Sequence, residues 1–243
     1  MTHYLAAEIQ NNTLMRKSAL SVLQGYNIRE PPVNVYQILT DQEVQVDFLP
    51  FRNSRLEGLY LRNITGSGIA VNSNHPRPKQ RFTAAHELKH HLHDVPDDGT
   101  QLPPCLSNAR THIERKANAF AAELLMPPTM FQAVIDELGE LLTITTLSAV
   151  FHVSYEATVY RLNTLRYIGD GQITKFLSST YRREDGQTAY QNRQNGNGRI
   201  AKIRVPAVQA ALGFIDGGRY CNNCGALLIN NQWNVCPECS TNL

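Results

Sequence analysis

The chain has 243 residues, 42% of them hydrophobic, and its formal net charge is only +2. This length exceeds one average domain, so the chain can hold a packed core and an appended module. The low net charge excludes a global electrostatic argument for nucleic-acid binding, and any such argument must be local. Residues 1–10 carry charge and no apolar signal-peptide core, and no long apolar stretch follows, so we expect a soluble, cytoplasmic protein.

The first half of the chain is predicted to contain helices followed by strands. Apolar spacing indicates a pair of helical segments over Leu5–Leu23 and a short helix over Val33–Leu39. The period then changes to two, and this alternation predicts three strands near residues 44–48, 59–61 and 69–71. We expect these strands to form a small antiparallel sheet.

The most informative segment is His86-Glu87-Leu88-Lys89-His90. It lies within Gln80–Leu92, whose apolar spacing predicts a helix. Two histidines four positions apart on a helix differ by about 40° of rotation and about 6 Å of rise, so both imidazoles can reach one metal ion. Glu87 would lie beside that metal and could take a proton from the water that attacks a carbonyl.

Catalytic zinc commonly has three protein ligands, and the best candidate for the third is Glu114. This residue opens an alanine-rich stretch, ended by Pro127, whose small apolar residues share one helical face with Glu114. Glu123 lies roughly 180° further around that helix, so it cannot face the same ion. Asn118 falls one turn after Glu114 and is either the partner of a histidine ligand or an ordinary helix-packing amide.

Other histidines are weaker candidates for the metal. A lone histidine is more often an ordinary core or surface residue than a ligand. His91 points elsewhere around the helix, and His93 lies about 10 Å along the axis from His86. The sequence therefore predicts a catalytic zinc held by His86, His90 and Glu114.

Cys105 lies between the two predicted metal-binding helices, in the proline-constrained loop Leu102–Leu106. As a thiolate it could reach the open zinc position and displace water, giving a latent enzyme that a conformational change would release. The alternative is a buried, inert cysteine.

A sheet edge beside an active-site helix can hold a substrate as an added strand. Ala70–Ser73 is the candidate docking edge. An edge strand without a ligand is equally compatible with the sequence.

Residues 147–165 are predicted to form a helix, a tight turn at Val153-Ser154 and a second helix capped by Ser154. This is helix-turn-helix form, for which a structural role, direct duplex reading and partner docking all stay open. Arg161 and Arg166 are the only basic residues on the second helix, which is thin support for groove binding.

Residues 169–205 carry a local positive excess, with seven lysines and arginines against three acidic residues. Tyr181 and Tyr190 are interleaved with them, and Gln191–Gly198 is polar and glycine-rich enough to predict a mobile loop. Such a composition suits single-stranded nucleic acid through phosphate neutralisation and base stacking, and a solvated linker is the alternative. The candidate contacts are Arg182, Arg183, Arg193, Arg199, Lys202 and Arg204.

The C-terminus carries two Cys-x-x-Cys pairs. Four thiolates in this arrangement predict a tetrahedral structural zinc ribbon, and disulfides are not expected in a reducing cytoplasm. Because so short a module buries little apolar surface, the ion must supply much of its folding free energy. The expected ligands are Cys221, Cys224, Cys236 and Cys239.

Three segments resemble the ImmA/IrrE metallopeptidases: Arg81–His90, the Glu-x-x-Ala-Asn pattern of Glu114–Asn118, and Phe120–Pro127. The resemblance covers roughly residues 30–168. Lys89 stands where the family usually has glycine, but it removes no ligand.

This resemblance implies that His86, His90 and Glu114 bind zinc and that Glu87 is the general base. It also implies cleavage of one peptide bond in a helix-turn-helix repressor, which releases stress-response or antiphage-defence genes. The appended ribbon resembles the CapP-type branch, which accompanies CBASS antiphage operons. That finer resemblance implies a repressor encoded nearby and stimulation by single-stranded DNA.

We therefore predict an α+β protein with a small antiparallel sheet and zincin-like active-site helices. Its metallopeptidase domain spans residues 1–168, including the helix-turn-helix-like segment 147–165, and is followed by a basic extension over 169–216 and a zinc ribbon over 217–243. The expected function is a regulated zinc endopeptidase, with one catalytic and one structural zinc, that acts on a repressor and not at a membrane. The alternative is a nucleic-acid-binding transcriptional regulator with a vestigial peptidase site. Glu87 favours the enzyme, because a retired site has no need of a general base.

Overall fold

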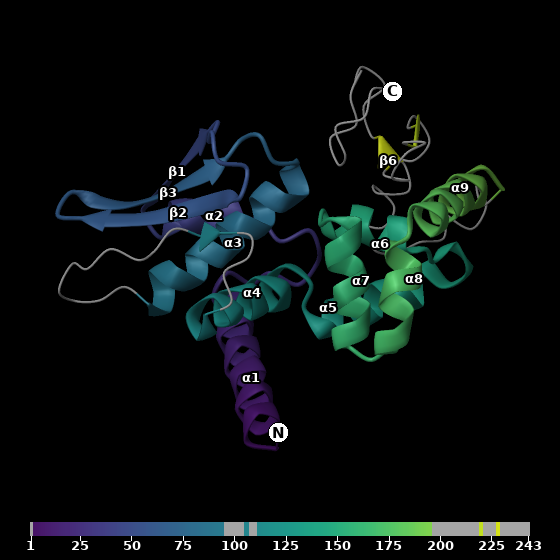
Figure 1. Ribbon diagram of the computed structural model, residues 1–243, viewed down its shortest axis with the longest axis horizontal. Helices are drawn as coiled ribbons and strands as arrows, with labels where there is room; N and C mark the ends of the chain where they lie inside the picture. Colours follow the sequence, from purple (N-terminus) through teal and green to yellow (C-terminus); the bar gives the residue numbers. More distant parts are fainter. Residues whose placement is uncertain (1, 95–104, 107–110, 196–218, 221–226, 229–243) are drawn as a thin grey trace. The chain divides into compact units, whose positions relative to one another are not determined.

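The computed structural model describes residues 2–94, 105–106, 111–195, 219–220 and 227–228 (Figure 1). The chain forms two compact units: residues 1–29 with 33–127, and residues 30–32 with 128–243. In the described part of the chain, no helix is long and apolar enough to cross a membrane.

The first unit contains a four-stranded sheet in the order β1-β3-β2-β4. Its strands are β1 (Val44–Leu49), β2 (Leu56–Asn63), β3 (Gly66–Asn72) and β4 (Cys105–Leu106). β2 runs antiparallel to β3 and to β4, whereas β1 is parallel to β3. The strand positions are as predicted, but the expectation of an antiparallel sheet is wrong. Alternation locates strands without giving their direction. β1 and β2 follow each other in the sequence but are not neighbours in the sheet, because β3 lies between them. The connection over residues 50–55 joins these two strands.

The predicted docking edge, Ala70–Ser73, is also wrong. Ala70 pairs with Asp47 of β1 on one side and with Leu59 of β2 on the other. β3 is therefore an interior strand with no free edge. The described edges of the sheet are β1 and β4.

The first unit also contains four described helices: α1 (Thr2–Gly25), α2 (Val35–Asp41), α3 (Arg77–His93) and α4 (His112–Leu125). α3 lies between the sheet and α4, and α4 packs on α1 (Figure 1). α1 is one continuous helix, not the predicted pair, because no glycine or proline interrupts residues 2–24.

The boundaries of α3 and α4 follow from their sequences. Pro76 is the N-cap of α3, and Pro78 lies in its first turn, where the missing N–H costs no hydrogen bond. The Thr111 side chain caps α4 by accepting a hydrogen bond from the backbone N–H of Glu114. Small buried residues, Ala84, Ala85, Ala117 and Ala121, allow the two helices to approach closely.

The second unit is largely helical. Its elements are α5 (Pro128–Leu138), η1 (Gly139–Leu141), α6 (Ile144–Phe151), α7 (Tyr155–Thr164), η2 (Asp170–Gln172), α8 (Ile173–Leu177), α9 (Ser179–Asn195), β5 (Arg219–Tyr220) and β6 (Leu227–Leu228). Buried Asp185 of α9 accepts backbone hydrogen bonds from Ile144 at 3.1 Å and Thr145 at 2.8 Å, so it caps α6. Because α9 continues to Asn195, the loop predicted over Gln191–Gly198 is wrong for residues 191–195.

α6 and α7 are the helix pair that the sequence predicts, joined by a short turn. His152 ends α6 in the left-handed conformation, and the Ser154 side chain caps α7 at Ala157. Arg161 is only 3% exposed, and the exposed face of α7 carries Glu156, Tyr160 and Thr164. That face offers no basic side chain to a DNA duplex. Arg166, predicted on this helix, lies beyond its end at Thr164 and pairs with Asp170 at 4.0 Å.

Candidate metal centre

Helices α3 and α4 bring together the side chains of His86, His90 and Glu114, all buried. Nε2 of His86 lies 3.0 Å from Nε2 of His90 and 3.1 Å from Oε2 of Glu114. Nε2 of His90 lies 3.4 Å from Oε1 of Glu114. Two nitrogens and one carboxylate therefore converge on a single point.

The outer nitrogens of both imidazoles are held by hydrogen bonds. His86 Nδ1 lies 2.9 Å from Asn118 Oδ1, and His90 Nδ1 lies 2.6 Å from Asp94 Oδ2. Both partners are acceptors, so each Nδ1 carries a hydrogen and each Nε2 is directed at the centre. Three converging donors with supported imidazoles fit zinc, for which a catalytic site uses three protein ligands and one open position.

Asp94 is a member of this centre that the sequence reasoning missed. It is the C-cap residue of α3, four residues after His90, and this spacing could have identified it. Lys89 is 1% exposed and forms an ion pair with the same Asp94 carboxylate. Lys89, which stands where the family usually has glycine, is thus neutralised by an ion pair with Asp94.

Replacing Asp94 with asparagine is expected to weaken zinc binding by about 10–100-fold, because the imidazole loses its charged support. A chelator competition titration of the full chain measures the effect. Asp136→Asn on α5 is the matched control and should bind zinc as the unmodified chain does. Equal affinities for both variants would show that Asp94 gives His90 no support.

Without metal, the centre is a network of charged groups. Burial opposes the imidazolium of His90, but hydrogen bonds to Asp94 and Glu114 outweigh it and raise the pKa of His90 to about 9. Burial likewise opposes the carboxylate of Glu114, but hydrogen bonds from His86 and His90 lower its pKa to about 2. At neutral pH a proton on His90 therefore occupies the position that a metal would take.

Zinc affinity should accordingly rise with pH. Below about 9, the pKa of His90 in the metal-free chain, zinc must displace a proton, and its affinity falls about tenfold for each pH unit. Above that pH the proton has already left and the affinity levels off. Competition titrations between pH 6.5 and 9.5, corrected for protonation of the chelator, test this. A flat profile across the range contradicts the protonated state of His90.

Glu87 lies beside this centre and is 2% exposed. Burial raises the pKa of Glu87 to about 7, although His86 and His90 partly offset the rise. Its Oε1 atom accepts no hydrogen bond from the part of the chain that the structure describes. A buried carboxylate that titrates near neutrality is suited to accept a proton at physiological pH.

Cys105 of β4 lies beside the centre, next to His86 and Glu87. Its sulfur and the ligand atoms of His86 and Glu87 all lie within 4.8 Å of one another. Burial, followed by the charge of Glu87, raises the pKa of the Cys105 thiol. In the metal-free chain this group is therefore a neutral thiol.

Other residues singled out from the sequence lie elsewhere or outside the described residues. Arg182 packs over the Tyr155 ring, and Arg183 is exposed. The side chains of Arg193, Arg199, Lys202, Arg204, Cys221, Cys224, Cys236 and Cys239 lie outside the described residues.

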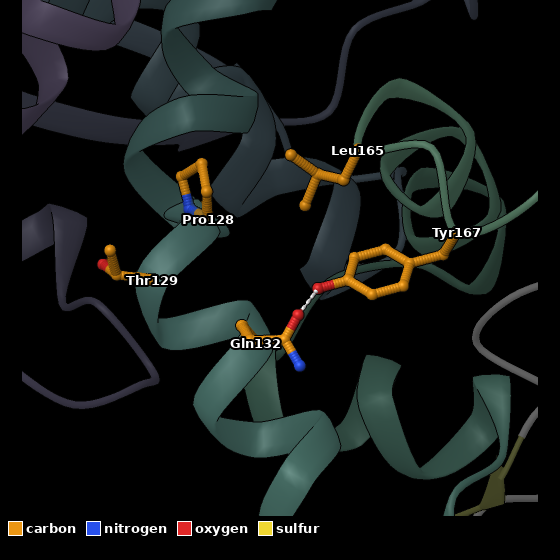
Figure 2. A pocket seen from close by; sticks show the side chains of 5 residues that line it. All are labelled: Pro128, Thr129, Gln132, Leu165 and Tyr167. Atoms are coloured by element: carbon orange, nitrogen blue, oxygen red, sulfur yellow. Dashed lines mark hydrogen bonds between the residues drawn. The ribbon is translucent and has the colours of Figure 1, made fainter.

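The second unit has an open pocket of about 460 Å³, shown in Figure 2. The Tyr167 hydroxyl donates a hydrogen bond to Gln132 at its mouth. Among the described residues, no histidine, cysteine or carboxylate lines it. Its lining residues are Pro128, Thr129, Gln132, Leu165 and Tyr167.

Comparisons with known proteins agree with the geometry of the centre. A search of the curated proteins finds no match. A family model of the M78 peptidases, described as the IrrE N-terminal-like domain, matches residues 39–163, just over half of the chain. This segment includes all three converging side chains and Glu87. The chain therefore belongs to the M78 peptidase family.

Proposed function

We propose that this chain is a regulated zinc endopeptidase that cleaves a helix-turn-helix transcriptional repressor. The observation that carries the proposal is a buried carboxylate, Glu87, beside His86, whose imidazole converges with His90 and Glu114 on one point. A vestigial site would have no need of this group. The absence of basic side chains on the exposed face of α7 also disfavours a duplex-reading regulator.

The residues of the centre divide the work of hydrolysis. His86, His90 and Glu114 would hold zinc, which when bound polarises the scissile carbonyl and makes water a better nucleophile. Glu87 accepts a proton from the attacking water at its carboxylate. It then donates that proton to the nitrogen of the leaving amine as the C–N bond breaks. Burial excludes bulk water from this exchange.

The proposed enzyme is latent until β4 is displaced. β4 pairs with the edge of β2, with Cys105 opposite Gly58, so the chain's own segment occupies the edge next to α3. The Cys105 sulfur, close to His86 and Glu87, would fill the open zinc position as a thiolate. Moving β4 away would free both the sheet edge and the metal.

Cys105→Ala should therefore raise basal cleavage, on the order of tenfold, by increasing the competent fraction of molecules. Ser107→Ala, two positions further along the sequence, is the control and leaves the sulfur in place. Initial rates of repressor cleavage without any activator measure the difference. Equal basal rates for Cys105→Ala and the unmodified chain refute the latency.

Single-stranded DNA is the proposed activator. Supporting this, the rings of Phe176 and Tyr181 are 4.7 Å apart, and Lys175 Nζ lies 6.0 Å and 5.8 Å from their centroids. An exposed lysine beside two partly exposed rings suits phosphate contact and base stacking. The predicted ribbon would add a structural zinc to the same unit.

The direct test first searches the genes beside that of this chain for a small helix-turn-helix protein, the expected repressor. The zinc-loaded chain is incubated with it, with and without single-stranded DNA, and products are mapped by mass spectrometry. We expect one cleaved peptide bond and a faster reaction with DNA. Intact repressor under both conditions contradicts the proposed substrate, and cleavage unaffected by DNA contradicts the activator.

A further inference from the structure

Gly58 of β2 lies at the closest approach of the sheet to α3. It is buried, and a Cβ built on it would lie 2.5 Å from Thr83 Cγ2, 2.9 Å from Glu87 Oε1 and 3.3 Å from the Ala70 carbonyl oxygen. Real Cβ contacts essentially never fall below 3.0 Å. The two side chains of α3 therefore occupy the space that a β2 side chain would need.

These two neighbours would respond differently to an added methyl group. Thr83 Oγ1 also has no hydrogen-bond partner among the described residues, but Thr83 is branched at Cβ and 1% exposed, so a rotation that moves its methyl group must still fit both branches into a packed interior. Glu87 has a longer side chain, and its Oε1 has no hydrogen-bond partner among the described residues. The longer Glu87 side chain therefore has more ways to adjust, and its carboxylate is the group expected to move.

The metal ligands are not part of this contact. The three atoms nearest to the built Cβ belong to Thr83, Glu87 and Ala70, not to His86, His90 or Glu114. A side chain at position 58 would therefore move the general base while leaving the ligands in place.

We propose that Gly58 is a positioning residue for Glu87: its missing side chain leaves the space in which the catalytic carboxylate is held against β2. The inference rests on the proposed peptidase function. Sub-ångström misplacement of a proton acceptor is costly, because proton transfer needs hydrogen-bond distance to the attacking water.

The experiment compares zinc-loaded full-length variants acting on the helix-turn-helix protein described above. Gly58→Ala should lower kcat by about 100-fold at unchanged KM and unchanged zinc content. Gly68→Ala is the matched control in the same sheet, because its Cβ would meet only the Gln45 carbonyl oxygen at 3.7 Å. It should retain full kcat. Unchanged kcat in Gly58→Ala, or a rise in KM alone, overturns the proposal.

A second variant separates the base from general packing. Gly58→Ala combined with Thr83→Ser removes the 2.5 Å contact and keeps the 2.9 Å contact with Glu87. Compared with Gly58→Ala alone, the double variant should recover most of any loss in Tm and none of the loss in kcat. Recovery of kcat would assign the defect to packing between β2 and α3, and overturns the proposal.

A crystal structure of zinc-loaded Gly58→Ala supplies a readout that needs no substrate. We expect a displaced Glu87 carboxylate and undisturbed His86, His90 and Glu114. If the unmodified chain cleaves no repressor, the proposed substrate fails, and this structure still decides the role of Gly58. If the Glu87 carboxylate keeps its original position in the Gly58→Ala structure, the proposed role of Gly58 is overturned.

Discussion

Replacing Glu87 with glutamine is expected to leave zinc binding intact and to lower kcat by about 10²–10⁴-fold. Glutamine has nearly the same shape as glutamate but cannot accept a proton from water. Glu87 is not one of the three converging side chains, so metal content should not change. Single-turnover cleavage of the repressor, together with zinc analysis of the same sample, measures both quantities.

Glu57→Gln is a suitable control for this experiment. Glu57 is the neighbour of Gly58 on β2 and forms an ion pair with Lys79 at 3.0 Å. Glu57 therefore has the same carboxylate group as Glu87 and lies nearby, but it is not part of the centre. The Glu57→Gln variant should retain activity. Undiminished proteolysis by Glu87→Gln would refute the assigned mechanism.

Replacing Glu114 with alanine is expected to weaken zinc binding by more than about 100-fold. Loss of a supporting residue outside the ligand set already costs about 10–100-fold, and loss of a ligand removes a direct bond to the metal. The two imidazoles that remain cannot complete the site. Zinc content after dialysis and chelator competition report the affinity, and repressor cleavage should fall in parallel.

Glu123→Ala, on the same helix, is the matched control. Glu123 is nine positions further along α4, roughly 180° around the axis, and is not in the group that converges with the histidines. Its variant should keep both zinc and activity. If Glu114→Ala bound zinc as tightly as Glu123→Ala does, the third ligand would have been assigned wrongly.

Helical spacing accounts for what could be predicted of the centre. His86 and His90 are one turn apart on α3, and Glu114 falls at the N-terminus of α4 on the face lined with alanine. Both facts follow from a period of 3.6 residues together with capping and proline signals. Periodicity of two likewise located β1, β2 and β3.

The remaining features depend on contacts between distant segments, which local patterns do not encode. Strand direction and order are not contained in alternation, so the parallel pairing of β1 with β3 and the interior position of Ala70 were missed. Gly58 became informative only when its distance to Thr83 and Glu87 was known. Asp94 was within reach of the spacing argument, because it lies one turn after His90.

The most direct measurement is an anomalous difference map from crystals of the zinc-loaded chain, collected on both sides of the zinc absorption edge. The account predicts a strong peak within bonding distance of His86 Nε2, His90 Nε2 and a Glu114 carboxylate oxygen. A map with no peak there, in protein shown to be replete with zinc, would contradict it.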